Sequence, residues 1–147
     1  MSHPEPALSI AEAAAASGLS ADTLRYYERD GLMLRPVARS ATGHRRYSAA
    51  DLRWIDLISR LRSTGMPIHD VRRYAALVRA GAGNEQERLD LLRAHRSLVL
   101  AQLAEVQEHL GAIDRKIGIY TDKIDADKID RADTLDLERA PTPKVEA

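Results

Sequence analysis

The chain has 147 residues, of which 44% are hydrophobic and 30% are charged, with 22 basic and 22 acidic side chains. This composition supports one packed domain with an extension and excludes wholesale disorder. No apolar run is long enough to cross a bilayer, and the lack of cysteine excludes disulfides, thiolate metal sites and thiol nucleophiles. Residues 1–7 show no basic segment followed by an apolar one, so we expect a cytoplasmic protein.

The charge is distributed unevenly along the chain. Residues 1–80 carry twelve arginines, no lysine and eight acidic residues, whereas residues 81–147 have a net charge of −4. Arginine is the basic side chain that makes forked contacts with phosphate and guanine. The first half of the chain is therefore the half in which we expect nucleic-acid contacts.

Two short helices are predicted at the start of the chain. Ser9 and Glu12 form a capping box, and Gly18 follows the helix that they begin. Ser20 caps a second helix over residues 21–30. Two helices joined by a glycine-containing turn are typical of a helix-turn-helix.

The second helix has one polar face and one apolar face. At 100° per residue, Arg25, Tyr26 and Arg29 share the first, while Leu24 and Tyr27 share the second. A helix of this kind fits the major groove of B-DNA. The alternative is a solvated surface with a chance pair of arginines.

A short β-hairpin is predicted between residues 33 and 47, with Gly43 near its tip. Arg45 and Arg46 make it basic, as expected of a wing that lies along a phosphate backbone. A charged edge strand that resists aggregation is the alternative interpretation. Further helices follow, the third capped by Ser48 and the fourth beginning after Met66 and Pro67.

From Leu89 the apolar residues recur at alternating intervals of three and four, which indicates a coiled coil. At ~1.5 Å per residue this helix would run roughly 54 Å, too long to bury its stripe within its own domain. It therefore needs a partner helix. The stripe consists of Leu89, Leu92, Arg96, Val99, Leu103, Val106, Leu110, Ile113, Ile117, Tyr120 and Ile124.

Taken together, these elements resemble the MerR family of bacterial transcription regulators over roughly residues 8–124. The likeness is carried by Leu8-Ser9-Ile10-Ala11-Glu12, Thr23-Leu24-Arg25-Tyr26-Tyr27-Glu28, Gly43-His44-Arg45-Arg46-Tyr47-Ser48 and Leu61-Arg62-Ser63-Thr64-Gly65-Met66. It implies a mainly α fold, with a winged helix-turn-helix domain over residues 8–81 and a dimerisation helix over residues 85–124. We expect residues 125–147 to form a flexible tail.

The resemblance also implies a homodimer, joined by antiparallel long helices, that binds a pseudo-palindromic promoter operator. Such regulators bend and untwist DNA to realign the promoter for RNA polymerase. The dimerisation residues would be Leu92, Val99, Leu103, Val106, Leu110, Ile113, Ile117 and Tyr120. The DNA contacts would be Arg25, Tyr26, Arg29, Arg45, Arg46 and Tyr47.

The sequence says little about an effector. The likeness is greatest to the short, aldehyde- or electrophile-responsive branch, but a chain without cysteine cannot sense by a thiol. The histidines form no ligand cluster, so we expect neither a metal nor a cofactor. Two alternatives stay open, namely no ligand at all or a small organic effector, which we would expect near Trp54, Leu57 and Tyr74.

Two other function classes compete with the regulator. One is a coiled-coil interaction or adaptor protein that keeps a winged fold without specific DNA binding. The other is an enzyme, which nothing supports, because the sequence has no glycine-rich phosphate loop and no set of a nucleophile, histidine and carboxylate.

Overall fold

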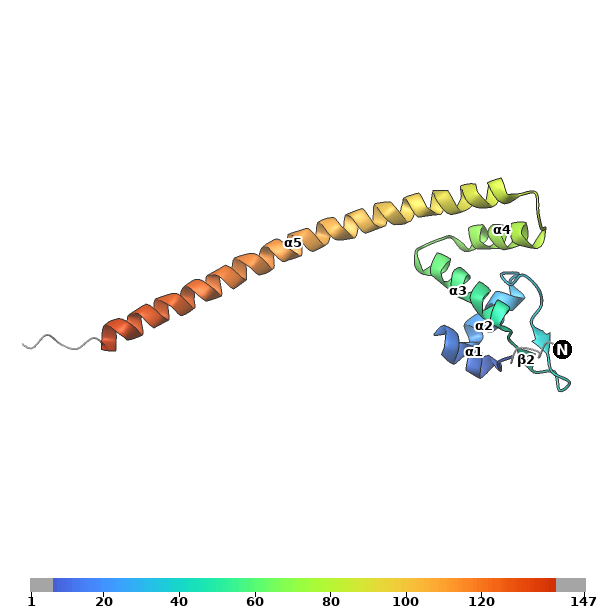
Figure 1. The fold of residues 1–147 in the computed structure, drawn as a ribbon, viewed down its shortest axis with the longest axis horizontal. Helices are drawn as coiled ribbons and strands as arrows, with labels where there is room; N and C mark the ends of the chain where they lie inside the picture. Colours follow the sequence, from blue (N-terminus) through green and yellow to red (C-terminus); the bar gives the residue numbers. More distant parts are fainter. Residues whose placement is uncertain (1–6, 140–147) are drawn as a thin grey trace, which may run out of the picture. The chain divides into compact units, whose positions relative to one another are not determined.

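The computed structural model describes residues 7–139 of the chain. Of these, residues 7–99 and residues 100–139 form two compact units. Within the described range, no helix is long and apolar enough to span a membrane. In chain order the elements are α1 (Ile10–Ser17), α2 (Ala21–Arg29), β1 (Ala38–Arg39), β2 (Arg45–Arg46), α3 (Ala49–Ser63), α4 (Ile68–Arg79) and α5 (Glu85–Arg139) (Figure 1).

The helix boundaries follow the capping residues closely. Ser9 and Glu12 make both hydrogen bonds of the predicted capping box, and Ser48 with Asp51 makes the same pair at the start of α3. Gly18 ends α1 in the left-handed conformation at a φ of 73°, which glycine adopts without steric cost. The predicted mainly α fold with a helix-turn-helix, a small hairpin and a long final helix is confirmed.

The hairpin is a small antiparallel sheet. Ala38 pairs with Arg46, and Arg39 pairs with Arg45. Its turn runs through Gly43, whose φ of 83° again requires glycine. At the base, Leu8 and Tyr47 exchange two backbone hydrogen bonds of 2.8 Å, which attach the hairpin to the chain before α1.

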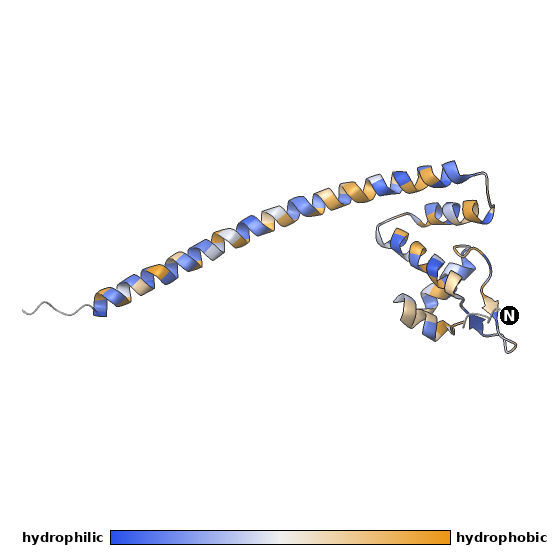
Figure 2. Cartoon of the chain, viewed as in Figure 1, coloured by the Kyte–Doolittle hydropathy of each residue, from blue (hydrophilic) through white to orange (hydrophobic). Residues whose placement is uncertain are grey.

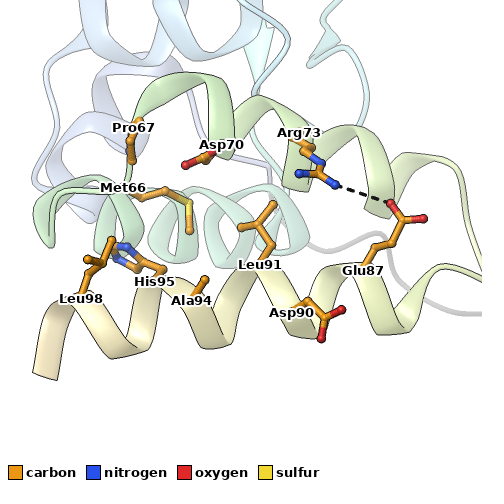
Figure 3. Close-up of a pocket in the computed structure, with 10 residues that line it drawn as sticks. All are labelled: Met66, Pro67, Asp70, Arg73, Glu87, Asp90, Leu91, Ala94, His95 and Leu98. Atoms are coloured by element: carbon orange, nitrogen blue, oxygen red, sulfur yellow. Dashed lines mark ion pairs between the residues drawn. The ribbon is translucent and has the colours of Figure 1, made fainter.

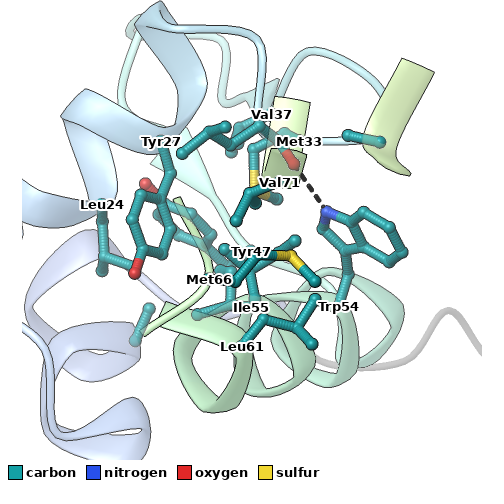
Figure 4. Packing of buried hydrophobic residues seen from close by; sticks show 14 residues of the cluster. Leu24, Tyr27, Met33, Val37, Tyr47, Trp54, Ile55, Leu61, Met66 and Val71 are labelled. Atoms are coloured by element: carbon teal, nitrogen blue, oxygen red, sulfur yellow. Dashed lines mark hydrogen bonds between the residues drawn. The ribbon is translucent and has the colours of Figure 1, made fainter. Parts of the chain in front are cut away.

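The core of the first unit forms where α1, α2, α3 and α4 meet. Ile55 of α3 and Val71 of α4 are fully buried (Figure 4). Ile58 of α3 is fully buried as well. Trp54 donates from its indole N–H to the Leu32 carbonyl oxygen at 2.7 Å. This bond ties α3 to the segment that connects α2 with the hairpin.

The long helix α5 contains 55 residues and begins within the first unit. Leu91 and Leu92 pack against the core there. His95, which is 9% exposed, makes a 2.7 Å hydrogen bond through Nε2 with the hydroxyl of Thr64, the residue that caps the end of α3. These contacts fix the start of α5 on α3 and α4.

The prediction of a flexible tail from Asp125 was wrong for residues 125–139, because α5 continues to Arg139. The reason is local. No glycine or proline lies between Ile119 and Ala140, and Asp127 and Arg131 are spaced to attract each other on one helix face. Pro141 is the next helix breaker along the chain. The rest of the predicted tail, residues 140–147, lies outside the described residues.

Candidate nucleic-acid interface

Helix α2 presents the predicted polar face to solvent. Leu24 and Tyr27 are 1% and 5% exposed and pack into the core, while Arg25 and Arg29 are exposed and Tyr26 is half-buried. The Arg29 guanidinium lies over the Tyr26 ring, 5.9 Å from its centroid. Burial of the apolar face therefore fixes which side of α2 can enter a groove of DNA.

The Arg25 side chain is held by a neighbour on its own helix. Its Nη1 donates to Asp22 Oδ1 at 2.9 Å, and the Asp22 side chain is 95% exposed. Such an exposed pair contributes little to stability. The Arg25 guanidinium group therefore stays at the surface of α2.

The wing lies against α2 through one carboxylate, which the sequence pattern did not predict. Glu28 Oε2 accepts a 3.0 Å hydrogen bond from Arg45 Nε, and Glu28 Oε1 lies 3.6 Å from Arg39 Nη2. The only sequence signal for this contact between α2 and the wing was an acidic side chain on a predicted helix ahead of an arginine-rich hairpin. That signal does not reveal which arginine the carboxylate meets.

A basic hollow of about 530 Å³ lies where the start of α1, the face of α2 and the wing come together. Four arginines and a histidine contribute to it, and that positive charge suits the phosphate backbone of a nucleic acid. Its lining residues are Ser9, Ile10, Arg25, Arg39, Ser40, Thr42, Gly43, His44, Arg45 and Arg46. The structure thus brings together Arg25, Arg45 and Arg46, which the sequence placed on separate elements.

Tyr47 does not belong to this surface, so its prediction as a DNA contact was wrong. Its side chain is 1% exposed and packs in the core below the wing. Burial raises the pKa of its phenol above the ordinary value, an effect partly opposed by Arg45. Tyr47 directly follows β2, and its two backbone hydrogen bonds with Leu8 hold it at the base of the hairpin, where its side chain enters the core while that of Arg46 stays exposed.

The predicted effector residues pack against the core and against one another. Trp54 is 9% exposed, and its ring stacks on Tyr74 with centroids 5.7 Å apart and an angle of 10° between the planes. Leu57 and Tyr74 are partly buried against the core. Within this unit the indole N–H and one face of the Trp54 ring are already occupied, and an effector site at these three residues stays a prediction.

A hollow of about 340 Å³ lies instead between α4 and the start of α5 (Figure 3). Met66, Leu91 and Leu98 supply apolar surface, and His95 lines it from α5. Arg73 Nη2 and Glu87 Oε2 lie 3.9 Å apart beside it. Among residues 7–139, no group of three or more histidines and carboxylates is arranged to hold a metal ion.

The apolar stripe of α5 is exposed along most of its length. From Leu103 to Ile124 its seven side chains are 50–60% exposed, and Figure 2 shows hydrophobic segments recurring along the helix. Leu92 differs, because it is half-buried against the core of its own unit. The exposed members are Leu103, Val106, Leu110, Ile113, Ile117, Tyr120 and Ile124.

These features define a winged helix-turn-helix DNA-binding protein, with α2 as recognition helix and a basic wing beside it. Comparison with known families agrees. Residues 8–77 match the "MerR HTH family regulatory protein" family, and residues 52–116 match the family "MerR, DNA binding". The chain belongs to the MerR family, and it is a DNA-binding transcriptional regulator.

Individual relatives support this assignment. An uncharacterized HTH-type transcriptional regulator of Haemophilus influenzae is 37% identical over 110 residues, which cover 75% of this chain and 81% of the relative. The regulator AdhR of Bacillus subtilis is 37% identical over 93 residues, covering 63% of this chain and 66% of AdhR. The assignment to an aldehyde-responsive branch stays a prediction.

One solved structure shows a relative with a similar fold together with the promoter DNA that it binds. HiNmlR, described as a MerR family regulator lacking the sensor domain and bound to promoter DNA, is similar with a TM-score of 0.70 and 36% identity. The match covers 78% of this chain and 90% of HiNmlR. A MerR family structure from Listeria monocytogenes reaches a TM-score of 0.77 at 37% identity, covering 90% of this chain and 99% of that one.

Proposed function

We propose that the protein acts in the cytoplasm as a homodimer that binds a pseudo-palindromic promoter operator. In this proposal it bends and untwists the DNA so that RNA polymerase can use the promoter. The observation that carries the proposal is the basic hollow, which places arginines of the recognition helix and of the wing side by side. Promoter DNA is also the ligand of the similar HiNmlR.

The two groups of arginines have different tasks in this proposal. Arg25 and Tyr26, with Arg29 beside them, lie on the face of α2 that enters the major groove, where arginine reads guanine. Arg45 and Arg46 on the wing contact phosphates, which provide affinity without sequence preference. The wing therefore positions the protein, and the recognition helix selects the sequence.

The homodimer is supported by the exposed stripe on α5. Burying a half-exposed Leu, Ile or Val side chain contributes about 1 kcal/mol, and six such residues recur at coiled-coil spacing together with Tyr120. A second copy of the same helix offers the matching stripe. Antiparallel pairing would carry two DNA-binding units, one for each half of a pseudo-palindrome.

The DNA bends if the dimer holds its two DNA-binding domains closer together than the two half-sites lie on straight DNA. Smooth bending of a site of 20–30 base pairs costs on the order of 1–6 kcal/mol, which a set of phosphate contacts can offset. Footprinting on the region upstream of the protein's own gene would show whether the protected site lies in the promoter spacer. Protection without any distortion-sensitive cleavage pattern would contradict the bending step.

A small organic effector completes the proposal. Because Trp54 is packed, we assign the effector to the hollow between α4 and α5, where apolar surface meets the polar side chain of His95. A compound that binds there should raise the unfolding temperature. The variant Ala94→Trp, which fills the hollow, should lose that shift and keep its DNA affinity. Equal shifts in both proteins would place the compound elsewhere.

The division of labour between the arginines can be tested directly. Arg25→Ala should lose discrimination at one or two base positions of each half-site, by about 1–3 kcal/mol each. Arg45→Ala should weaken binding to all sequences and lower the salt dependence by about one unit for each phosphate that the variant no longer neutralises. Competition assays with point-substituted duplexes separate the two effects. Equal loss of specificity in both variants would contradict the proposal.

A further inference from the structure

We infer that Glu28 is a positioning residue for DNA binding, which aims the wing arginines at the phosphate backbone although its own charge repels DNA. This inference rests on the proposed role of Arg45 as a phosphate contact. Glu28 stands on the recognition helix and contacts Arg39 of β1 and Arg45 of β2. It thus joins α2 to both strands of the wing.

The register of the hairpin places two positive charges side by side. Arg39 and Arg45 are direct cross-strand partners, and like charges placed opposite each other destabilise a strand pair. Each strand has only two residues, so few other cross-strand contacts are available to offset this repulsion. One carboxylate facing both guanidinium groups offsets that repulsion and holds the two side chains together.

The contact between Glu28 and Arg45 is partly buried. Their side chains are 18% and 24% exposed, so the pair is shielded from water better than an ordinary surface pair. The wing itself is internally fixed, because Arg39 Nη1 donates to the Gly43 carbonyl oxygen at 3.0 Å across the turn. A wing that is fixed internally moves as a unit, and Glu28 determines where that unit sits against α2.

Glu28 occupies one edge of the Arg45 guanidinium group and leaves the rest open. It accepts from Nε, and no other hydrogen bond of the Arg45 side chain occurs within the described part of the chain. A guanidinium group has five N–H donors, so its two terminal amino groups remain for a phosphate. Arg45 lines the basic hollow, and Glu28 therefore orients that fork toward a ligand of the hollow.

Two explanations of Glu28 predict opposite effects of the Glu28→Gln substitution. If Glu28 acted only as a negative charge near DNA, Glu28→Gln would strengthen binding and increase its salt dependence. If it positions Arg45, Glu28→Gln should weaken binding about two- to tenfold for each half-site, since the arginine side chain must then be immobilised upon binding. The salt dependence should fall as the phosphate contact weakens.

The measurement is a salt titration of the full-length protein on the duplex protected in the footprint. Asp56→Asn is the matched control, because Asp56 pairs with Arg60 on α3 and makes no hydrogen bond or ion pair with the wing or α2 within the described residues. It removes the same charge and should not weaken binding. Unfolding curves of both variants show whether the fold is retained, and Glu28→Asp, which keeps the charge, should retain more affinity than Glu28→Gln.

A double variant identifies the residue through which Glu28 acts. In an Arg45→Ala background, Glu28→Gln should lose most of its weakening effect. If Arg45→Ala binds as tightly as wild type, the proposed phosphate contact itself is wrong. If Arg45→Ala weakens binding but Glu28→Gln leaves it unchanged or strengthens it, the interface stands and only the positioning role of Glu28 is refuted.

Discussion

Tyr47→Phe should make the protein more stable without changing its affinity for DNA. The Tyr47 side chain is 1% exposed, and its hydroxyl has no hydrogen-bond partner within residues 7–139. A buried hydroxyl without a partner costs about 1–3 kcal/mol in lost hydration. Phenylalanine keeps the ring and removes that cost, so the gain in the free energy of unfolding should fall in the same range.

The pH dependence gives this prediction a second check. Burial raises the pKa of the Tyr47 phenol above its ordinary value, which is about 10. The unfolded chain therefore releases this proton more readily than the folded chain does. The contribution of the protonated phenol to the free energy of unfolding is complete below about pH 10 and is lost as the pH rises through the folded pKa. The advantage of Tyr47→Phe over wild type should therefore grow above about pH 10.

Urea unfolding at one fixed chain concentration, followed by circular dichroism, measures the effect. Fixing the concentration matters because a dimer gains apparent stability as its concentration rises. A loss of about 1 kcal/mol or more would contradict this prediction, because it would show that the hydroxyl is hydrogen-bonded in solution. A roughly tenfold loss of DNA affinity at unchanged stability would instead restore Tyr47 as a DNA contact.

Two further predictions concern the long helix and the core. Leu103→Glu combined with Leu110→Glu should yield monomers in analytical ultracentrifugation, because both charges would enter the proposed seam, whereas dimers would show that the seam is elsewhere. Trp54→Phe should destabilise the first unit by about 2–4 kcal/mol in the same unfolding assay, because it removes ring volume and the hydrogen bond to the Leu32 carbonyl. A change below about 0.5 kcal/mol would mean that this bond contributes nothing measurable.

The proposed interface was largely predictable from local sequence. The two faces of α2 follow from a period of 3.6, and Leu24 and Tyr27 are buried as that period requires. The wing was predictable in position, because a glycine turn between short flanks specifies a hairpin. The contact of Glu28 with the wing was not predictable, because no spacing rule links a carboxylate on a helix to an arginine 17 residues further along the chain.

Local sequence was enough to predict where most of the helices begin and end and which face of each is apolar. Serine caps, glycine ends and apolar spacing act over a few residues, so they leave a record in a short window of sequence. Tertiary structure alone decided that Tyr47 is buried, that Trp54 donates to the Leu32 carbonyl oxygen, and that Glu28 pairs with Arg45 of the wing. Each of these depends on contacts between separate elements, whose distances are set by packing of the whole core and by no local propensity.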